Sequence, residues 1–447
     1  MRIINMDNVE LGLKETKTQS EAQKDNFYGP DYFAENDNKN KKMASKSAVI
    51  CYGFGDLASQ FIWTFVGSYL TIFYTDVVGL TPIIVSAIML GARIWDAVND
   101  PLMGAIAERT RTKWGRFRPY IAFGCPALAL FGVMTEDADQ RNKINTSRNI
   151  GMNVGMIIVN SCSAGLALYF SGSGAQVANG YGYMMVALVY SIIAVPLFFV
   201  VFFTSKEYVA PVNNIAKFSF KDTFANLVHN KYLMIVTGIM ALQMTAFMGR
   251  IAVCAFYVIY CLGSFTMIAF IMTIPSIGAV IGSLFVPYLA KKMGKRNVLM
   301  YSMLIQAVGL LVIYLAPFDN MTMVIIGCCI FGLFNVGFPM TLSMVADSVD
   351  YMELKTGIRT DGTAYATYGL ATKVGNALGG SVGVLLLSTF GYVANAQQTA
   401  GALRGINIVV NLIPAVLFIL AAALCLLWKM TDAQADDIRI ALDNKQR

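Results

Sequence analysis

Charged residues and histidine are scarce in this chain of 447 residues. Only 14% of its residues are charged and 56% are hydrophobic, whereas about a quarter of the residues in a soluble domain are charged. The one histidine, His229, lies in a polar linker, so histidine-based catalysis has little to work with. These shortages argue against a soluble enzyme and favour an integral membrane protein.

Motifs for metal or nucleotide chemistry are also missing from the sequence. None of the eight cysteines forms a Cys-x-x-Cys pair, and all lie in apolar segments, which predicts buried small side chains rather than zinc ligands or disulfides. There is no visible nucleophile–base set or phosphate-binding glycine loop, so we expect no catalytic residues and no cofactor. The net charge of +7 would suit nucleic acid, but the basic residues fall between apolar segments, where membrane topology explains them better.

Long apolar runs dominate the chain after residue 43. The polar stretch before them lacks the pattern of a signal peptide and predicts a disordered tail. The eleven apolar segments are residues 51–75, 82–106, 119–134, 149–171, 181–203, 232–260, 264–290, 298–316, 322–346, 363–392 and 405–430. The third is only about half as long as a usual membrane-spanning helix. We therefore expect an all-α integral membrane protein.

The connections between the apolar segments alternate in charge. Glu108–Arg118 contains five cations and Lys291–Arg296 contains four, whereas the connections on the opposite side have almost none. Positively charged loops stay in the cytoplasm, so we expect a multi-pass protein of the cell inner (plasma) membrane with both termini cytoplasmic.

The two basic loops lie at similar positions on either side of a polar linker, which indicates an internal repeat. Two bundles joined by a cytoplasmic linker are the plan of the major facilitator fold. The expected parts are a tail (1–43), an amino-terminal bundle (44–205), the linker (206–230), a carboxy-terminal bundle (231–431) and a second tail (432–447).

The second apolar segment holds the most informative cluster of polar residues. Asp96 and Asp100 lie one helical turn apart on the same face, with Asn99 beside them. Ionisable groups at membrane depth are costly and usually mark ion or substrate pathways. Oxygen ligands in this arrangement suit a hard cation or a proton. The alternative is that these carboxylates serve only to pair with Arg93, one turn before Asp96.

Six motifs together resemble the glycoside–pentoside–hexuronide:cation symporters, the family of the melibiose permease. They are Tyr52-Gly-Phe-Gly-Asp56, Phe73-Tyr-Thr-Asp-Val-Val-Gly-Leu80, Ala92-Arg-Ile-Trp-Asp-Ala-Val-Asn-Asp-Pro-Leu-Met-Gly104, Trp114-Gly-Arg-Phe-Arg-Pro119, Thr135-Glu-Asp-Ala-Asp-Gln-Arg141 and Met344-Val-Ala-Asp-Ser-Val-Asp-Tyr-Met-Glu353. The resemblance covers nearly everything after residue 45. It implies symport of a sugar with Na⁺, H⁺ or Li⁺ through one central cavity by alternating access, with Asp96, Asn99 and Asp100 as cation-binding residues. Apart from Na⁺, we expect no metal.

The resemblance also implies a set of sugar-binding residues. The family carries a first-helix carboxylate where this chain has Gln60, so Asp56, one turn earlier, is our candidate to replace it; a helix-packing hydrogen bond is the alternative role for Asp56. Arg148 and Lys373 match a family arginine and lysine near the cavity, and a lysine within a span rarely faces lipid. The predicted site is completed by two aromatic residues, Phe338, which can stack on a pyranose, and Tyr368.

Charges near the cytoplasmic side predict a set of gating ion pairs. We place Asp347, Asp350 and Glu353 in a cytoplasmic loop and expect them to pair across the two bundles, with solvation as the alternative. The predicted gating residues are Arg109, Arg111, Arg116, Arg118, Asp347, Asp350, Glu353 and Arg359. Glycines at four-residue spacing around Lys373 predict close helix packing.

The family pattern breaks between Met134 and Thr135. The end of the third helix and the whole fourth helix have no counterpart here, so the amino-terminal bundle is one helix short. As a helix, Pro119–Met134 would span about 24 Å, less than the hydrocarbon thickness of about 30 Å. Either 119–134 is a re-entrant hairpin, or everything after it is inverted against the charge bias.

We therefore predict a major facilitator fold with a truncated amino-terminal bundle, built for symport of a glycoside, pentoside or hexuronide with Na⁺ or H⁺. The alternatives are an inactive or degenerate copy and a non-transporting sugar sensor on the same fold. The expected partners are the sugar, the coupling cation and the lipid bilayer, with no nucleic acid, and the protein is expected to be a monomer.

Overall fold

The structure, a computed structural model, describes residues 45–109, 138–205, 230–333, 337–356 and 361–446. Every regular element in these ranges is a helix, as predicted. The expected tail 1–43, the third apolar segment 119–134 and most of the basic loop 108–118 and the linker 206–230 lie outside the described residues.

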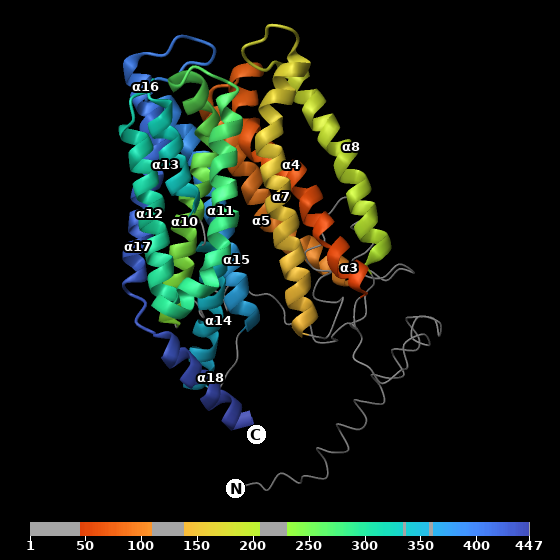
Figure 1. Ribbon diagram of the computed structural model, residues 1–447, viewed down its shortest axis with the longest axis vertical. Coiled ribbons are helices and arrows are strands. Elements are labelled where there is room, and N and C mark those ends of the chain that lie inside the picture. Colours follow the sequence, from red (N-terminus) through yellow and green to blue (C-terminus); the bar gives the residue numbers. More distant parts are fainter. Residues whose placement is uncertain (1–44, 110–137, 206–229, 334–336, 357–360, 447) are drawn as a thin grey trace. The chain divides into compact units, whose positions relative to one another are not determined.

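Four long helices make up the described amino-terminal part (Figure 1). They are α4 (Gly53–Ile72), α5 (Pro82–Arg109), α7 (Ala138–Ser171) and α8 (Gly180–Thr204). A short helix, α3 (Lys46–Cys51), precedes α4; its N-cap is Ser45, whose side chain accepts a hydrogen bond from the Ala48 N–H. The end of α4 widens into a π-helical turn, η1 (Phe73–Val77).

The carboxy-terminal part is formed by the remaining helices and two further π-helical turns. They are α10 (Lys231–Phe256), η3 (Tyr257–Cys261), α11 (Met267–Met293), α12 (Lys295–Leu315), α13 (Met321–Leu333), α14 (Gly337–Thr356), α15 (Asp361–Thr389), α16 (Ala400–Asn407), η4 (Ile408–Leu412), α17 (Ile413–Cys425) and α18 (Asp432–Gln446). The predicted tail 432–447 therefore contains a helix, α18.

Eight helices of the described residues are long and apolar enough to cross a membrane. Their outer surfaces have large hydrophobic side chains that are well exposed, such as Tyr169, Phe203, Leu284 and Leu315. Exposed apolar area on this scale marks a surface that contacts something other than water, here the acyl chains of lipids. The cysteines only partly match the prediction of burial, because Cys162 and Cys329 are exposed on helix surfaces.

Packing divides the chain into two units. The first comprises residues 1–56, 102–151 and 195–213, and the second comprises 57–101, 152–194 and 214–447. The division cuts through α4, α5, α7 and α8, so the larger parts of these helices belong to the same unit as the carboxy-terminal helices. The bundle boundaries expected from the sequence stay a prediction.

Helices α4 and α7 run parallel, which decides between the two expected paths of the chain. A Cβ on Gly151 would clash with the Gly53 carbonyl oxygen, and one on Gly155 would lie 3.0 Å from the Leu57 carbonyl oxygen, so residue numbers rise together along the contact. Helix α5 runs antiparallel to α4, because Arg93 on α5 stacks on the Trp63 ring of α4 and the two residues lie at similar separations after and before the turn at Gly79. Helix α7 therefore begins at the end of the molecule where α5 finishes, and the inverted alternative is wrong.

Glycines bring α10 and α15 into close contact, as their spacing predicts. A Cβ on Gly375 would lie 2.7 Å from the Ala241 carbonyl oxygen, and one on Gly379 would lie 2.5 Å from the Thr245 carbonyl oxygen. Larger residues at these positions would force the helices apart. Small residues at such spacing let helix backbones touch within a membrane.

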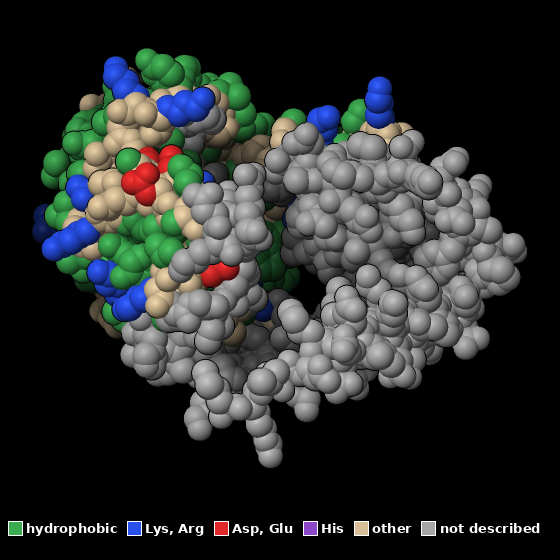
Figure 2. Space-filling view, turned by 90° about the horizontal axis from the view of Figure 1, so that it is seen from below, with side chains coloured by type: hydrophobic (Ala, Val, Ile, Leu, Met, Phe, Trp, Pro, Cys, Tyr) green, Lys and Arg blue, Asp and Glu red, His purple; other side chains and the backbone are tan. Residues whose placement is uncertain are grey.

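The two ends of the second unit differ in charge. The end that carries α18 has the basic stretch Lys291–Arg296, and Figure 2 shows Lys and Arg side chains along the edge of its described surface. The connections at the opposite end, residues 78–81, 172–179, 262–266, 316–320 and 390–399, contain no Lys or Arg. This asymmetry is the one that the positive-inside rule uses.

Candidate functional site

The predicted cation-binding residues lie on α5. Asp96 forms an ion pair with Arg93, at 3.4 Å between Oδ2 and Nη1, and the Arg93 guanidinium also stacks 4.8 Å from the centre of the Trp63 ring. The Asp96 side chain is 48% exposed, and ion pairs this exposed contribute little to stability. Asn99 is half-buried, and the side chain of Asp100 lies outside the described residues. The ion pair expected as the alternative role is therefore present, and it occupies one carboxylate oxygen.

Asp56 and Arg148 meet where α4 and α7 cross. The Arg148 Nε lies 2.6 Å from Asp56 Oδ2, and Nη2 lies 3.4 Å from Oδ1, which gives a two-pronged contact. The two side chains are 23% and 16% exposed, respectively. The close approach of Gly53 and Gly151 places the two helix backbones in contact beside this pair. Two of the predicted sugar-site residues are thus in direct contact. In this contact Asp56 has the helix-packing role that was expected as its alternative.

The other predicted sugar-site residues lie in the second unit. The Gln60 Oε1 accepts a hydrogen bond of 2.7 Å from Thr64, one turn further along α4. Tyr368 is buried, with its hydroxyl 2.8 Å from the Thr341 hydroxyl. Lys373 is half-buried on α15, and the side chain of Phe338 lies outside the described residues. Convergence of Lys373 with the Asp56–Arg148 pair stays a prediction.

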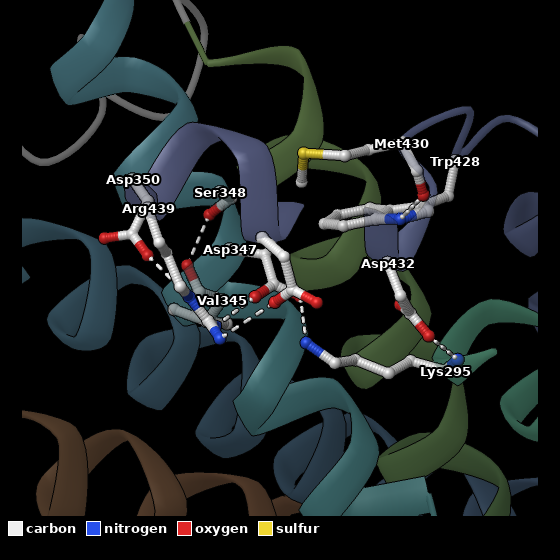
Figure 3. Close-up of polar contacts among 10 residues, drawn as sticks. Lys295, Val345, Asp347, Ser348, Asp350, Trp428, Met430, Asp432 and Arg439 are labelled. Carbon is white, nitrogen blue, oxygen red and sulfur yellow. Dashed lines mark hydrogen bonds and ion pairs between the residues drawn. The ribbon is translucent and has the colours of Figure 1, made fainter. Parts of the chain in front are cut away.

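The predicted gating acids lie within α14 and not in a loop, which corrects the sequence-based placement. Asp347 is 3% exposed and pairs with Lys295 Nζ at 2.6 Å and Arg439 Nη2 at 2.7 Å. Arg439 also reaches Asp350, at 3.3 Å (Figure 3). Burial raises the pKa of Asp347, while Lys295 and Arg439 oppose that rise.

The observed partners of Asp347 come from α12 and α18, two helices of the carboxy-terminal part. Glu353 is half-buried one turn beyond Asp350 on α14. The side chain of Arg109 and the residues Arg111, Arg116, Arg118 and Arg359 lie outside the described residues, so pairing between the bundles stays a prediction. Arg439 was not among the predicted residues, because α15, α16 and α17 separate α18 from α14 along the chain.

A hydrogen-bonded cluster at the opposite end was not predicted from the sequence. Asp76 accepts from the Tyr260 hydroxyl at 2.6 Å and from the Tyr392 hydroxyl at 2.5 Å, and the Asn395 side chain donates to the Asp76 carbonyl oxygen. These residues come from η1, from η3 and from the turn after α15. Burial and the nearby Asp76 charge raise the pKa of Tyr392 well above its usual value, so the tyrosine stays protonated as a donor.

Two further contacts in the same unit link amino-terminal helices to carboxy-terminal ones. The Ser86 hydroxyl on α5 donates to the Ser381 carbonyl oxygen at 2.9 Å. The Asn160 amide on α7 donates to the Ser276 hydroxyl at 3.1 Å and to the Met272 carbonyl oxygen at 3.3 Å. With the Asp76 cluster, these bonds hold α4, α5 and α7 against α10, α11 and α15 in this structure. Residue types alone gave no signal for them, because serine and asparagine are common in membrane helices.

Comparison with known proteins gives a consistent assignment. Residues 51–134 and 123–432 match the family described as MFS/sugar transport protein. The isoprimeverose transporter of Lactiplantibacillus pentosus is 30% identical, with 87% of this chain and 90% of that protein aligned. The glucuronide carrier protein homolog of Escherichia coli (strain K12) is 25% identical, with 91% and 97% aligned. The solved nucleoside transporter NupG shares 14% identity and superposes with a TM-score of 0.55 over 86% of this chain, a likeness of fold alone.

The alignments also contain positions that this chain lacks. The alignment with the glucuronide carrier protein homolog extends over 460 positions, more than the 447 residues of the whole chain, although 91% of the chain takes part. The family match is likewise split into two stretches, which overlap at residues 123–134. The predicted resemblance and the all-helical fold are confirmed. The chain belongs to the MFS/sugar transport protein family and is a multi-pass membrane transporter of sugars.

Proposed function

We propose that this protein is a secondary active symporter that carries a glycoside, pentoside or hexuronide together with Na⁺ or H⁺. The observation that carries the proposal is the polar cluster on α5 in a chain whose relatives are sugar transporters and symporters. Asp96 keeps one carboxylate oxygen outside its ion pair with Arg93 in the described part of the chain. With Asn99 and Asp100 on the same helix face, that oxygen would complete a set of ligands for a small cation.

Alternating access requires that the two ends of the carrier close in turn. The three hydrogen-bonded contacts around Asp76, Ser86 and Asn160 support a state in which the end with few charges is closed. In this proposal these bonds must break before the sugar enters from that side. The basic end would face the cytoplasm, with both termini there, in the cell inner membrane.

A second candidate function is sugar binding without transport, and the short connection between α5 and α7 favours it. Residues 110–137 join the end of α5 to the start of α7. Two full membrane spans need about 40 residues, more than this connection has. The extra positions in the relatives support a missing fourth helix at this point.

Uptake and binding measured together separate the two candidates. Cells without other sugar carriers would be tested for accumulation of radiolabelled glycosides under an imposed Na⁺ or pH gradient. The purified protein would be tested for thermal stabilisation by the same glycosides. Uptake that depends on the gradient supports symport, binding without uptake supports the second candidate, and loss of both indicates an inactive copy.

A further inference from the structure

A buried arginine on α10 lacks the partner that its charge requires. Arg250 is 5% exposed and is the one buried Lys or Arg within the described ranges. Its Nη2 lies 4.0 Å from the Cys328 sulfur, and its guanidinium lies 4.8 Å from the centre of the Phe331 ring, both on α13. Its Nε–H has no acceptor among the described residues. A guanidinium stays charged at any physiological pH, so this is a buried cation.

Three partly buried cations of the described residues have a carboxylate partner, whereas Arg296 donates to the Trp428 carbonyl oxygen instead. Arg148 has Asp56, Arg93 has Asp96, and Lys295 has Asp347. No carboxylate in the described part of the chain pairs with Arg250, although it is more buried than any of these three. The contact with Phe331 offsets only part of the cost of burying an ion. An ionisable residue within a membrane span usually marks a substrate or ion pathway.

The surroundings of Arg250 fit a ligand that contains hydroxyl groups. Gln243 and Tyr257 lie seven residues before and after Arg250, which places all three on one face of the helix continued by η3. The Gln243 Oε1 and the Tyr257 hydroxyl are buried and also have no partner among the described residues. Buried polar atoms without partners are rare and call for water or a ligand. The adjacent Gly249 packs on α15, whereas Arg250 itself contacts α13.

We infer that Arg250 binds the anionic group of the substrate, and that the substrate is an acidic sugar such as a uronic acid glycoside. The inference rests on the proposed sugar-binding function and narrows it. A carboxylate offers two oxygens to the fork of the guanidinium and is ionised at neutral pH. It would supply the missing counter-charge, while Gln243 and Tyr257 would bind hydroxyl groups.

The test compares ligands that differ only in the carboxylate. Thermal unfolding of the purified full-length protein would be followed with the 4-nitrophenyl glycosides of glucuronic acid and glucose, and with those of galacturonic acid and galactose. The variants are Arg250→Met, which keeps length without charge, and Arg250→Lys, which keeps charge without the fork. Arg404→Met, on the exposed surface of α16, is the control for loss of a positive charge.

We expect the native protein to bind one uronide at least about tenfold more tightly than its neutral counterpart, as charge-assisted hydrogen bonds would give. Arg250→Met should abolish this preference and should unfold at the same or a higher temperature, because an uncompensated charge has been removed. Arg250→Lys should retain part of the preference, and Arg404→Met all of it.

Two results would overturn the inference while leaving the proposed function intact. One is a native protein that prefers the neutral glycosides. The other is an Arg250→Met variant that keeps the uronide preference, or that is destabilised and loses both ligands equally, as a purely structural arginine would. If the native protein binds none of the four glycosides, the proposed sugar site itself fails and the inference fails with it.

Discussion

Replacing Asp76 by Asn should open the end of the molecule that carries few charges. In the native structure the Asp76 carboxylate accepts hydrogen bonds from Thr75, Tyr260 and Tyr392. A hydrogen bond to a charged group contributes about 1.5–3 kcal/mol. Asn keeps one acceptor oxygen, turns the other position into a donor and removes the charge.

The expected cost of the Asp76→Asn substitution is about one such bond plus weakening of the other. We place it at roughly 2–3 kcal/mol, which changes the ratio of closed to open states about 30- to 150-fold. A closed end that is favoured by about that energy would then be open in about half of the molecules. Tyr392→Phe removes one donor and should produce a smaller shift in the same direction.

Spin labels at Gln176 and Gln397, exposed residues of two turns at this end, would report the opening. Pulsed electron spin resonance should give a longer distance, or a second longer population, in Asp76→Asn than in the native background. Asp319→Asn is the matched control, because Asp319 is an exposed acid in another turn at the same end. Identical distance distributions for the native protein and Asp76→Asn would refute the idea that the Asp76 cluster holds this end closed.

Four further outcomes follow from the ion pairs and the short connection. Arg148→Met should lower the unfolding temperature, with a cost of about 1–3 kcal/mol for leaving Asp56 half-buried and unpaired, and adding Asp56→Asn should recover part of it; additive losses would contradict a direct pair. Arg439→Ala should release α18 from α14, which limited proteolysis would detect as faster cleavage of the carboxy-terminal end; an unchanged rate would contradict the docking role. Asp96→Asn should abolish the stimulation of sugar binding by Na⁺ or H⁺ in a binding assay, and unchanged stimulation would remove Asp96 from the cation site. Insertion of the corresponding stretch of a relative after Met134 should raise sugar uptake, and strong uptake by the chain as given would show that the short connection is not disabling.

The sequence was sufficient to predict the helices but not the tertiary partners of their polar residues. Apolar runs of suitable length reported where helices lie, because burial in lipid selects composition along the chain directly. The glycines around Lys373 also predicted close packing correctly, since a missing side chain has one main structural use in a membrane helix. These features are local, so one sequence reveals them.

The partners of Asp347 and Asp76 could not be predicted in the same way. Arg439 and Tyr392 are both far from them along the chain, and each contact depends on how the helices are arranged. Asp76 lies in a motif that supported the family resemblance, but the motif did not state what its carboxylate binds. Arg250 carried the same sequence signal as Lys373, a cation within an apolar segment. Only the structure shows that it is buried without a carboxylate partner among the described residues.

The parallel arrangement of α4 and α7 limits how the chain can run between these two helices. If the gap had removed an odd number of spans without a return, α7 would run antiparallel to α4, and the basic stretch Lys291–Arg296 would lie on the opposite side. The successive contacts of Gly151 with Gly53 and of Gly155 with Leu57 exclude that arrangement. In the carboxy-terminal part, α10 and α15 are in close contact and Arg250 packs on α13. Binding determinants on the carboxy-terminal helices can therefore persist where transport, which needs both halves, is impaired.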